Sequence, residues 1–187
     1  MENNIKNNIG IKNIGINKSD DVKNNNGKIN ETIYEFLKKY GIKTNNPIYL
    51  RGFTHSSYAK QRKIEDYEKL EFLGDAILEF CVSKYIYKNF NSLNVGEMSK
   101  KRMLLTQGTT LSSCFKTFNL DKEIKIINLP NNQIPNRIYE DLYESLIGCL
   151  FLDKGINVCQ QFIEQTLIKF SFLNKDEIID DYKTKLQ

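Results

Sequence analysis

The sequence predicts an all-α protein with one folded domain of ordinary size. Apolar residues recur at intervals of three and four along much of the chain, as on a helix that buries one face. No stretch of any length alternates apolar and polar residues as a half-buried strand does, and no segment repeats. The chain of 187 residues is long enough to bury one hydrophobic core.

The first segment, residues 1–27, differs in composition from the rest of the chain. Nine of its 27 residues are Asn, and Lys and Ile supply much of the remainder. Such a tract buries too little apolar surface to fold alone, so we predict a flexible tail. An arm that binds a partner or touches RNA is the sharper alternative, which the sequence does not favour. We place the folded domain at residues 28–175.

Two helices and a loop are predicted in the first part of this domain. The first helix, 28–40, has Asn30 as its N-cap and is ended by Gly41. Pro47 opens the second helix, since an early helical position tolerates proline. A polar loop with basic residues comes next, at 60–66.

Five more helices are predicted beyond this loop, and an irregular stretch separates the third from the fourth. Their ranges are 67–90, 98–106, 109–118, 136–153 and 157–173. Two of the four cysteines lie in apolar helical runs and are predicted core residues; these are Cys81 and Cys149.

Carboxylates recur along one side of the first of these five helices. Four acidic residues follow one another at intervals of three or four positions: Glu68, Glu71, Asp75 and Glu79. Like charges at this spacing destabilise a helix by about 0.2–0.5 kcal/mol per pair. A divalent metal ion would offset the repulsion, and a solvated acidic face is the plainer alternative.

A second acidic pair, Asp141 and Glu144, lies in the strongly apolar helix predicted at 136–153. Two apolar helices that each carry inward-leaning carboxylates can build a metal site in a helical protein. The chain has one His, His55, so the ligands would be oxygen atoms, which suits Mg²⁺ or Mn²⁺ better than zinc, copper or iron. A helical di-iron site needs Glu-x-x-His pairs, and His55 is not placed to form one.

Four motifs of this chain resemble those of the ribonuclease III family, whose members cut double-stranded RNA. The acidic stretch EKLEFLGD at 68–75 resembles the family signature, and THSS at 54–57 precedes it. MSKKR at 98–102 and DLYESLIG at 141–148 resemble two further family motifs in the same order and spacing. The resemblance covers roughly residues 29–173.

This resemblance implies a double-strand-specific endoribonuclease that works by two-metal hydrolysis. The expected products carry 5′-phosphate and 3′-hydroxyl ends with two-nucleotide 3′ overhangs. The expected cofactor is Mg²⁺, with Mn²⁺ as a substitute, and no nucleotide cofactor is expected. The implied metal ligands are Glu71, Asp75, Asp141 and Glu144, of which Asp75 and Glu144 are also assigned to catalysis. Glu68 matches an acidic family position and is expected to form a salt bridge or to support the ligands instead of binding the metal directly.

The resemblance also implies a two-fold homodimer. Phe72 matches an exposed family aromatic that inserts into the partner subunit, and a core position is the alternative. The helix with the MSKKR motif is expected to contact RNA phosphates through Lys100, Lys101 and Arg102. Where the family often carries an additional acid, this chain has Val95.

Composition restricts the remaining possibilities. The formal charge is +4 and the isoelectric point is near 8.7, which is compatible with a polyanionic partner. No Cys-x-x-Cys pair suggests a zinc knuckle, and no apolar run approaches the ~20 residues of a membrane span. No signal core is present, so we expect reduced thiols and an intracellular, cytoplasmic protein.

Residues 176–187 resemble the linker that in many family members leads to a double-stranded-RNA-binding domain. We therefore expect the sequence to be a piece of a longer protein, with a catalytic domain standing alone as the alternative. A non-catalytic relative that binds double-stranded RNA, as a scaffold or a suppressor of silencing, is the rival function. The four carboxylates favour the enzyme.

Overall fold

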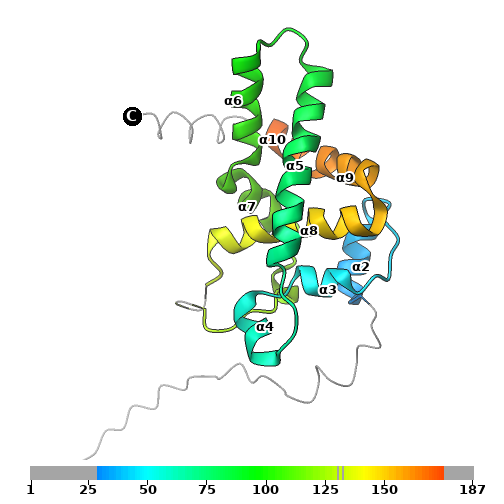
Figure 1. The fold of residues 1–187 in the computed structure, drawn as a ribbon, viewed down its shortest axis with the longest axis vertical. Helices are drawn as coiled ribbons and strands as arrows, with labels where there is room; N and C mark the ends of the chain where they lie inside the picture. The colour runs from blue at the N-terminus through cyan, green and yellow to red at the C-terminus, as the bar shows by residue number, and fades with distance from the viewer. Residues whose placement is uncertain (1–28, 130, 132, 175–187) are drawn as a thin grey trace, which may run out of the picture.

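The computed structural model describes residues 29–129, 131 and 133–174, which form a helical domain (Figure 1). Within these residues no strand occurs, and the all-α prediction is confirmed. The predicted tail at 1–27 and the predicted linker at 176–187 lie outside the described residues.

Nine α-helices, a 3₁₀ turn and a π-helical turn account for the regular structure of the described part. In chain order they are α2 (Glu31–Lys38), α3 (Ile48–Gly52), α4 (Ser56–Arg62), α5 (Glu68–Asn89), α6 (Val95–Thr106), α7 (Gly108–Lys116), η1 (Asp121–Glu123), α8 (Asn136–Lys154), α9 (Ile156–Ile163), η3 (Glu164–Ile168) and α10 (Lys169–Leu173).

Two long helices, α5 and α8, cross at the centre of the fold (Figure 1). They contact each other more extensively than any other pair of elements, and α7, α9 and α3 also pack on α8. The face of α8 toward the core is apolar along its length, with Leu142, Leu146 and Leu150 buried. The second half of α5 continues beyond this crossing and pairs with α6 (Figure 1).

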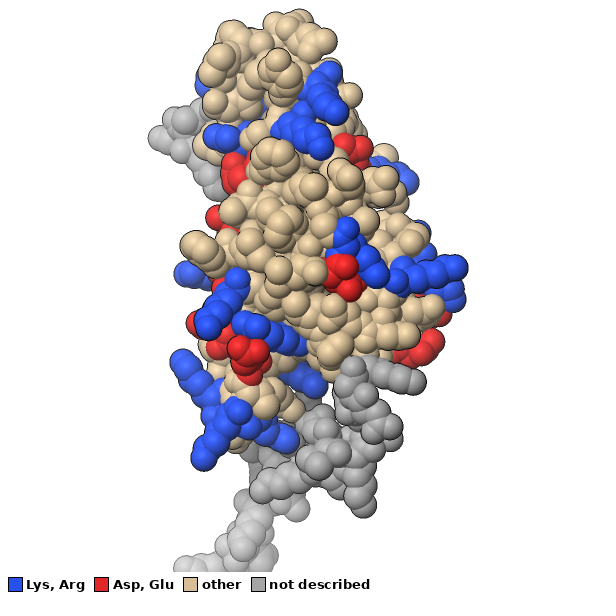
Figure 2. Space-filling view, turned by 45° about the vertical axis from the view of Figure 1, so that its right-hand side comes forward, with Lys and Arg blue, Asp and Glu red and all other residues tan. Residues whose placement is uncertain are grey.

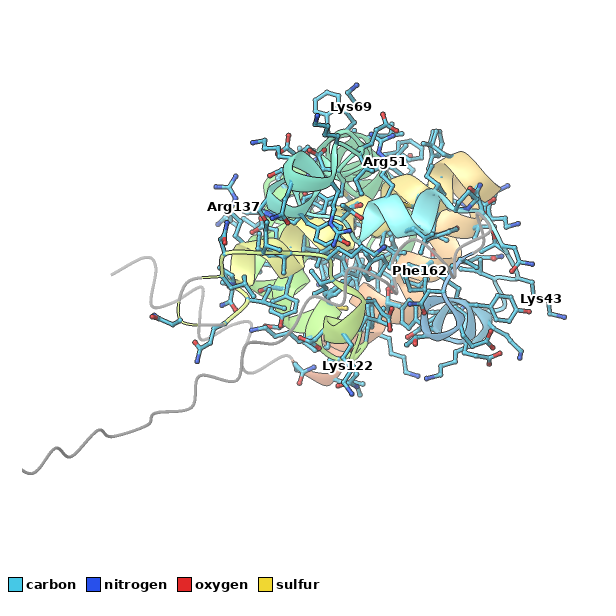
Figure 3. All side chains as sticks on the ribbon, turned by 90° about the horizontal axis from the view of Figure 1, so that it is seen from below. Lys43, Arg51, Lys69, Lys122, Arg137 and Phe162 are labelled. Atoms are coloured by element: carbon cyan, nitrogen blue, oxygen red, sulfur yellow. The ribbon has the colours of Figure 1, made fainter. Side chains whose placement is uncertain are left out.

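Aromatic rings fill the region between α2, α7 and α9. The ring of Phe162 lies 5.1 Å from that of Tyr40 and 6.2 Å from that of Phe118. Phe36 joins the same cluster from α2, at 4.8 Å from Phe118. Figure 3 shows Phe162 among the helices, whereas Lys43 and Lys69 extend outward. All four cysteines are free and buried, which confirms the core prediction for two of them.

Local signals in the sequence explain several helix boundaries. Asn30 caps α2 as predicted, because its side-chain oxygen accepts a hydrogen bond from the Thr32 amide at 2.8 Å. Gly41 follows that helix with φ of 77°, a left-handed conformation that glycine adopts without strain. Asn94 and Glu97 form a capping box that starts α6 before the predicted boundary.

The loop predicted at 60–66 is wrong in its first half. Those residues continue α4, which begins after His55 and ends where Lys63 takes φ of 55°. The imidazole Nδ1 of His55 accepts a hydrogen bond from the Ser57 amide at 3.1 Å, so histidine acts as the cap. Histidine is not among the usual capping residues, which is why the pattern did not indicate a helix here.

The last predicted helix is interrupted rather than continuous. A π-helical turn, η3, separates α9 from α10. Within it, the Thr166 hydroxyl donates to the Phe162 carbonyl at 2.7 Å and pairs with the buried Tyr143 hydroxyl at 2.8 Å. In the part of the chain that the structure describes, no helix is both long and apolar enough to span a membrane.

Candidate metal centre

The crossing of α5 and α8 is unusually close because each helix presents a glycine to the other. A Cβ atom on Gly74 would lie 1.8 Å from the backbone oxygen of Glu144. A Cβ atom on Gly148 would lie 2.2 Å from the backbone oxygen of Leu70. The two backbones are therefore in direct contact, and a side chain larger than hydrogen at either position would force them apart.

This contact brings the two acidic motifs together. Glu71 and Asp75 flank Gly74 on α5, and Glu144 on α8 contacts that glycine through its backbone oxygen. Burial, together with the carboxylates of neighbours led by Asp75, raises the pKa of Glu144 to about 8. Burial and the charge of Asp141 raise the pKa of Glu71 to about 7. Both helices thus direct like charges into one region.

The pKa values of the other two predicted ligands, Asp75 and Asp141, are also raised. Burial and the charge of Glu79 raise the pKa of Asp75, which is the most exposed of the four. Burial raises the pKa of Asp141, although hydrogen bonding from Tyr67 and the charge of Arg137 oppose the shift. Raised carboxyl pKa values are typical of acidic groups that lack a compensating cation.

The side chains do not stand in ligating positions. Across residues 29–129, 131 and 133–174, no three His, Cys, Asp or Glu side chains are arranged so that they could hold a metal ion. The carboxylates interact electrostatically through space without converging on one point.

Asp141 is held by contacts that the sequence did not indicate. The Tyr67 hydroxyl donates a hydrogen bond to its Oδ2 at 3.1 Å, and the Arg137 Nε lies 4.0 Å from its Oδ1. Arg137 extends outward from α8 (Figure 3) with 85% of its side chain exposed, so this ion pair is weak.

His55 packs against Tyr67, the residue that holds Asp141. Its ring lies edge-on to the ring of Tyr67, with centroids 5.8 Å apart. Its backbone amide donates to the Lys125 carbonyl at 2.9 Å, within an isolated parallel bridge that joins Thr54 to Lys125. The histidine therefore packs behind the start of the acidic helix.

Phe72 and Glu68 lie on the outer side of α5. Phe72 has 82% of its surface exposed, the highest value among the large apolar side chains of the described residues, so the core alternative is wrong. Glu68 is also exposed. Phe72 takes no part in the carboxylate cluster, whereas Glu68 lies at its edge, where its charge contributes to the raised pKa of Glu71.

The three basic residues of α6 differ in their surroundings. Arg102 forms an ion pair with Glu79 on α5 at 2.9 Å and donates to the Ser83 hydroxyl at 3.2 Å. Lys101 places its ammonium 4.3 Å from the centre of the Phe90 ring, and Lys100 is exposed. Arg102 therefore ties α6 to α5 through its ion pair with Glu79.

One further carboxylate, Glu140, belongs to the cluster and was missed. It precedes Asp141 on α8, and its charge contributes to the raised pKa values of Glu71 and Glu144. The signal was present in the sequence, because Glu140 and Glu144 are four residues apart and share one helical face.

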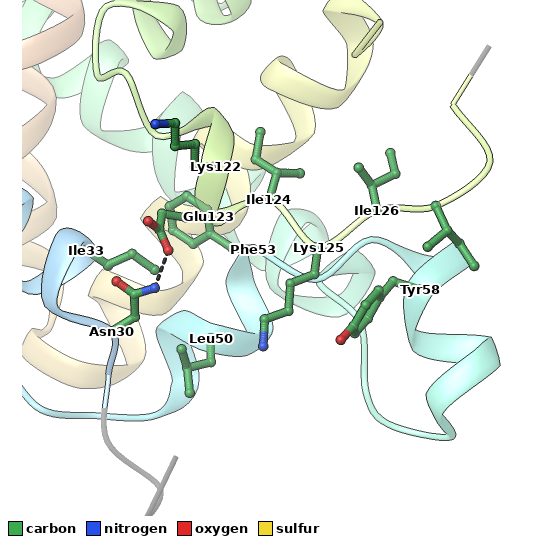
Figure 4. A pocket seen from close by; sticks show the side chains of 11 residues that line it. Asn30, Ile33, Leu50, Phe53, Tyr58, Lys122, Glu123, Ile124, Lys125 and Ile126 are labelled. Atoms are coloured by element: carbon green, nitrogen blue, oxygen red, sulfur yellow. Dashed lines mark hydrogen bonds between the residues drawn. The ribbon is translucent and has the colours of Figure 1, made fainter. Parts of the chain in front are cut away.

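Other surface features lie away from the carboxylates. A pocket of about 360 Å³ opens where the 122–127 segment passes α3 and α4 (Figure 4). Its lining includes Asn30 and Glu123, which are hydrogen-bonded, and none of the clustered carboxylates. On the face shown in Figure 2, basic side chains gather at the lower end, where α4 carries Lys60 and Arg62.

Comparison with known proteins agrees with these features. The model of the ribonuclease-III-like family matches residues 45–170. A protein named ribonuclease 3 from Mesoplasma florum is 37% identical over 165 residues, covering 83% of this chain and 70% of the relative. Ribonuclease 3 of Clostridium tetani is 40% identical over 141 residues, covering 73% of this chain and 60% of the relative. The chain thus spans about two thirds of the length of such relatives.

Solved structures share the fold. The nuclease domain of ribonuclease III from Campylobacter jejuni superposes with a TM-score of 0.65 at 22% identity, covering 75% of this chain and 96% of that domain. A second structure of that domain, described for flexibility in a region involved in dimer formation, gives a TM-score of 0.62. On the strength of the family match, the sequence relatives and this fold, the chain belongs to the ribonuclease III family.

Proposed function

We propose that this chain is an endoribonuclease that hydrolyses double-stranded RNA at the carboxylate cluster of α5 and α8. The observation that carries the proposal is the Gly74–Gly148 contact, which sets acidic residues of both helices beside one another in a member of this family. The relatives' name, ribonuclease 3, denotes the same activity.

Mg²⁺ is the cofactor of the proposal, with Mn²⁺ as its substitute. Glu71, Asp75, Asp141 and Glu144 would hold the metal, because hard divalent cations take oxygen ligands and these residues offer no other atoms. The donor set fits, and the raised pKa values of Glu71 and Glu144 indicate a region of excess negative charge that a cation would relieve. The torsions of Glu71, Asp75 and Glu144 would have to change, which the two long Glu side chains and the exposed position of Asp75 permit.

When bound, divalent cations supply the positive charge that stabilises the attacked phosphate and the leaving oxygen in hydrolysis. The protein's own part is to fix the carboxylates. Tyr67 holds Asp141 by its hydroxyl, and the glycine contact fixes the backbone of Glu144 against α5. Asp75 and Glu144 are the residues that we assign to catalysis.

A two-fold dimer is part of the proposal. Phe72 is exposed on α5, near the acidic residues of the same helix, at the position where the family signature carries an aromatic that inserts into the partner subunit. In a two-fold interface the contact made by Phe72 would occur twice, once from each subunit. Two active sites would then act on the two strands, which accounts for the staggered two-nucleotide 3′ overhangs.

The RNA surface of the proposal includes α6, with Lys100 as the exposed lysine and Lys101 beside it. Arg102 serves chiefly to hold α6 in place, since it is paired with Glu79. A-form RNA presents a wide and shallow minor groove, which a protein recognises by shape and phosphate position more than by sequence. The proposed catalytic domain is 28–175, and the proposed setting is inside the cell, where duplex RNA arises.

The test is cleavage of an end-labelled RNA duplex of about 30 base pairs, compared with the single strands and with a DNA duplex of the same sequence. Mg²⁺, Ca²⁺ and EDTA are compared in parallel. Cutting of the RNA duplex in Mg²⁺ alone, with two-nucleotide 3′ overhangs, is expected. Tight duplex binding with no product in Mg²⁺ or Mn²⁺ would contradict the enzyme and favour a binding scaffold.

A further inference from the structure

Glu140 differs from the other clustered carboxylates because its carboxylate group packs against Gly108, and we call this contact its seat. A Cβ atom on Gly108 would lie 2.2 Å from Oε2 of Glu140, 2.5 Å from its Cδ and 2.6 Å from its Oε1. The whole carboxylate group therefore lies directly against the Cα of Gly108. That glycine is the first residue of α7, so the seat exists only because α7 and α8 pack together.

The carboxylate is half-buried at the start of α7, where the positive end of the helix dipole attracts negative charge. Burial and the charge of Asp141 nevertheless raise the pKa of Glu140. Gly108 leaves room that a larger residue would fill. In Figure 1, α7 lies beside the first half of α8 and directly follows α6.

From this seat Glu140 acts on its neighbours through charge. Glu140 precedes Asp141 on α8 and lies one helical turn before Glu144. Its charge also acts on Glu71 of α5, and the charge of Asp75 acts on Glu140. Arg137 is a nearby cation, but water screens its exposed side chain, so it offsets little of this negative charge. Among these carboxylates, Glu140 is the one that packs against α7.

We propose that Glu140, seated on Gly108, is a positioning residue that raises the divalent-cation affinity of the four ligand carboxylates without being a ligand. The inference rests on the proposed function, because it concerns the same metal centre. A fixed negative charge beside the ligands favours a bound cation, and the same charge repels the ligands when no cation is present.

If Glu140 has this role, removing its charge should lower the affinity for Mn²⁺ and raise the melting temperature in EDTA. Glu140→Gln keeps the shape of the side chain and removes its charge. The variant should bind Mn²⁺ about 10-fold more weakly, in line with other residues that support metal ligands. Its melting temperature in EDTA should rise, because repulsion within the cluster is relieved. A residue with a merely structural role would lower the melting temperature in EDTA.

Gly108→Ala tests the seat without changing any charge. The new methyl group must displace the end of the flexible Glu140 side chain by about 1 Å to reach an ordinary contact distance. Mn²⁺ binding should weaken, by less than in Glu140→Gln. In the Glu140→Gln background the same alanine should have no further effect on affinity.

Two controls match these variants. Gly96→Ala places alanine in the first turn of α6, where the nearest atom to the new Cβ is the side-chain oxygen of Asn94 at 3.3 Å. Glu31→Gln removes one exposed negative charge from α2. Both should leave Mn²⁺ affinity unchanged.

The experiment is titration of the metal-free full chain with Mn²⁺ by electron paramagnetic resonance, with melting curves in EDTA. Unchanged affinity in Glu140→Gln, or equal losses in Gly96→Ala and Gly108→Ala, would overturn the inference. Asp75→Asn separates this failure from that of the proposed function. If Asp75→Asn abolishes binding while Glu140→Gln does not weaken it, only the role of Glu140 is wrong. If Asp75→Asn also binds normally, the metal centre itself is wrong.

Discussion

Replacing Gly74 by alanine tests how the fold builds the site. The added Cβ would lie 1.8 Å from the Glu144 backbone oxygen, and an ordinary contact needs about 3.4 Å, so α5 and α8 must separate by about 1.6 Å. The obstructing atoms are backbone, which cannot rotate away as a side chain does.

The magnitude follows from two opposing effects. Overpacking a tight contact costs about 1–3 kcal/mol, and a backbone clash belongs at the upper end. Alanine in place of glycine within a helix returns about 1 kcal/mol. A net loss of about 2 kcal/mol should lower the melting temperature of a chain of this size by about 4–8 °C.

The effect on cleavage should exceed the effect on stability. Glu71 and Asp75 move with α5, whereas Asp141 and Glu144 move with α8, so the separation spreads the proposed ligands. Displacement of reacting groups by about 1 Å can cost about 100-fold in rate. Single-turnover cleavage of an RNA duplex, at a temperature where the variant is fully folded, should fall by at least that factor.

The assay pairs urea unfolding with cleavage, and Gly96→Ala is the matched control. That glycine is also helical but has no backbone atom in its way, so its alanine variant should keep the rate and gain at most about 1 kcal/mol of stability. Wild-type stability together with wild-type cleavage in Gly74→Ala would refute the close crossing as the basis of the site.

Three other changes probe separate parts of the proposed site and interface. In EDTA the stability should fall as pH rises from about 4.5 to about 8, because folded Glu144 keeps a proton that the unfolded chain has released. Glu144→Gln should reduce the difference in the free energy of unfolding between pH 5 and pH 8 by about 1–2 kcal/mol, a value that allows for screening by water. Urea unfolding at the two pH values measures it. Phe72→Ala should raise the dimer dissociation constant at least ~10-fold in sedimentation equilibrium, and an unchanged constant would remove Phe72 from the interface. Tyr67→Phe deletes the hydroxyl that holds Asp141 and should weaken Mn²⁺ binding by about 10-fold with a loss of stability near 1 kcal/mol; wild-type Mn²⁺ affinity would contradict that role.

Much of the fold follows from the sequence because the two central helices are long and their buried residues recur at helical spacing. The apolar period of α5 and α8 and the glycine within each motif are visible in the chain, and both helices occur close to the predicted ranges. The short α4 was missed because its cap is His55, a residue that rarely performs this role.

The site is predictable only in part, since tertiary contacts assign several of its members. Nothing local to Tyr67 indicates a hydrogen bond to a residue 74 positions away. The seat of Glu140 depends on the packing of α7 against α8, and the pairing of Arg102 with Glu79 depends on that of α6 against α5. The assignment of metal ligands among the clustered carboxylates remains a prediction.

The most direct measurement of the central claim is single-turnover cleavage of a labelled RNA duplex by Glu144→Gln in saturating Mg²⁺, beside the wild-type chain. The substitution removes one carboxylate and changes the shape of the side chain little. We predict that duplex binding and dimerisation persist while cleavage is lost. Cleavage at the wild-type rate would show that the carboxylates of α5 and α8 are not the metal centre.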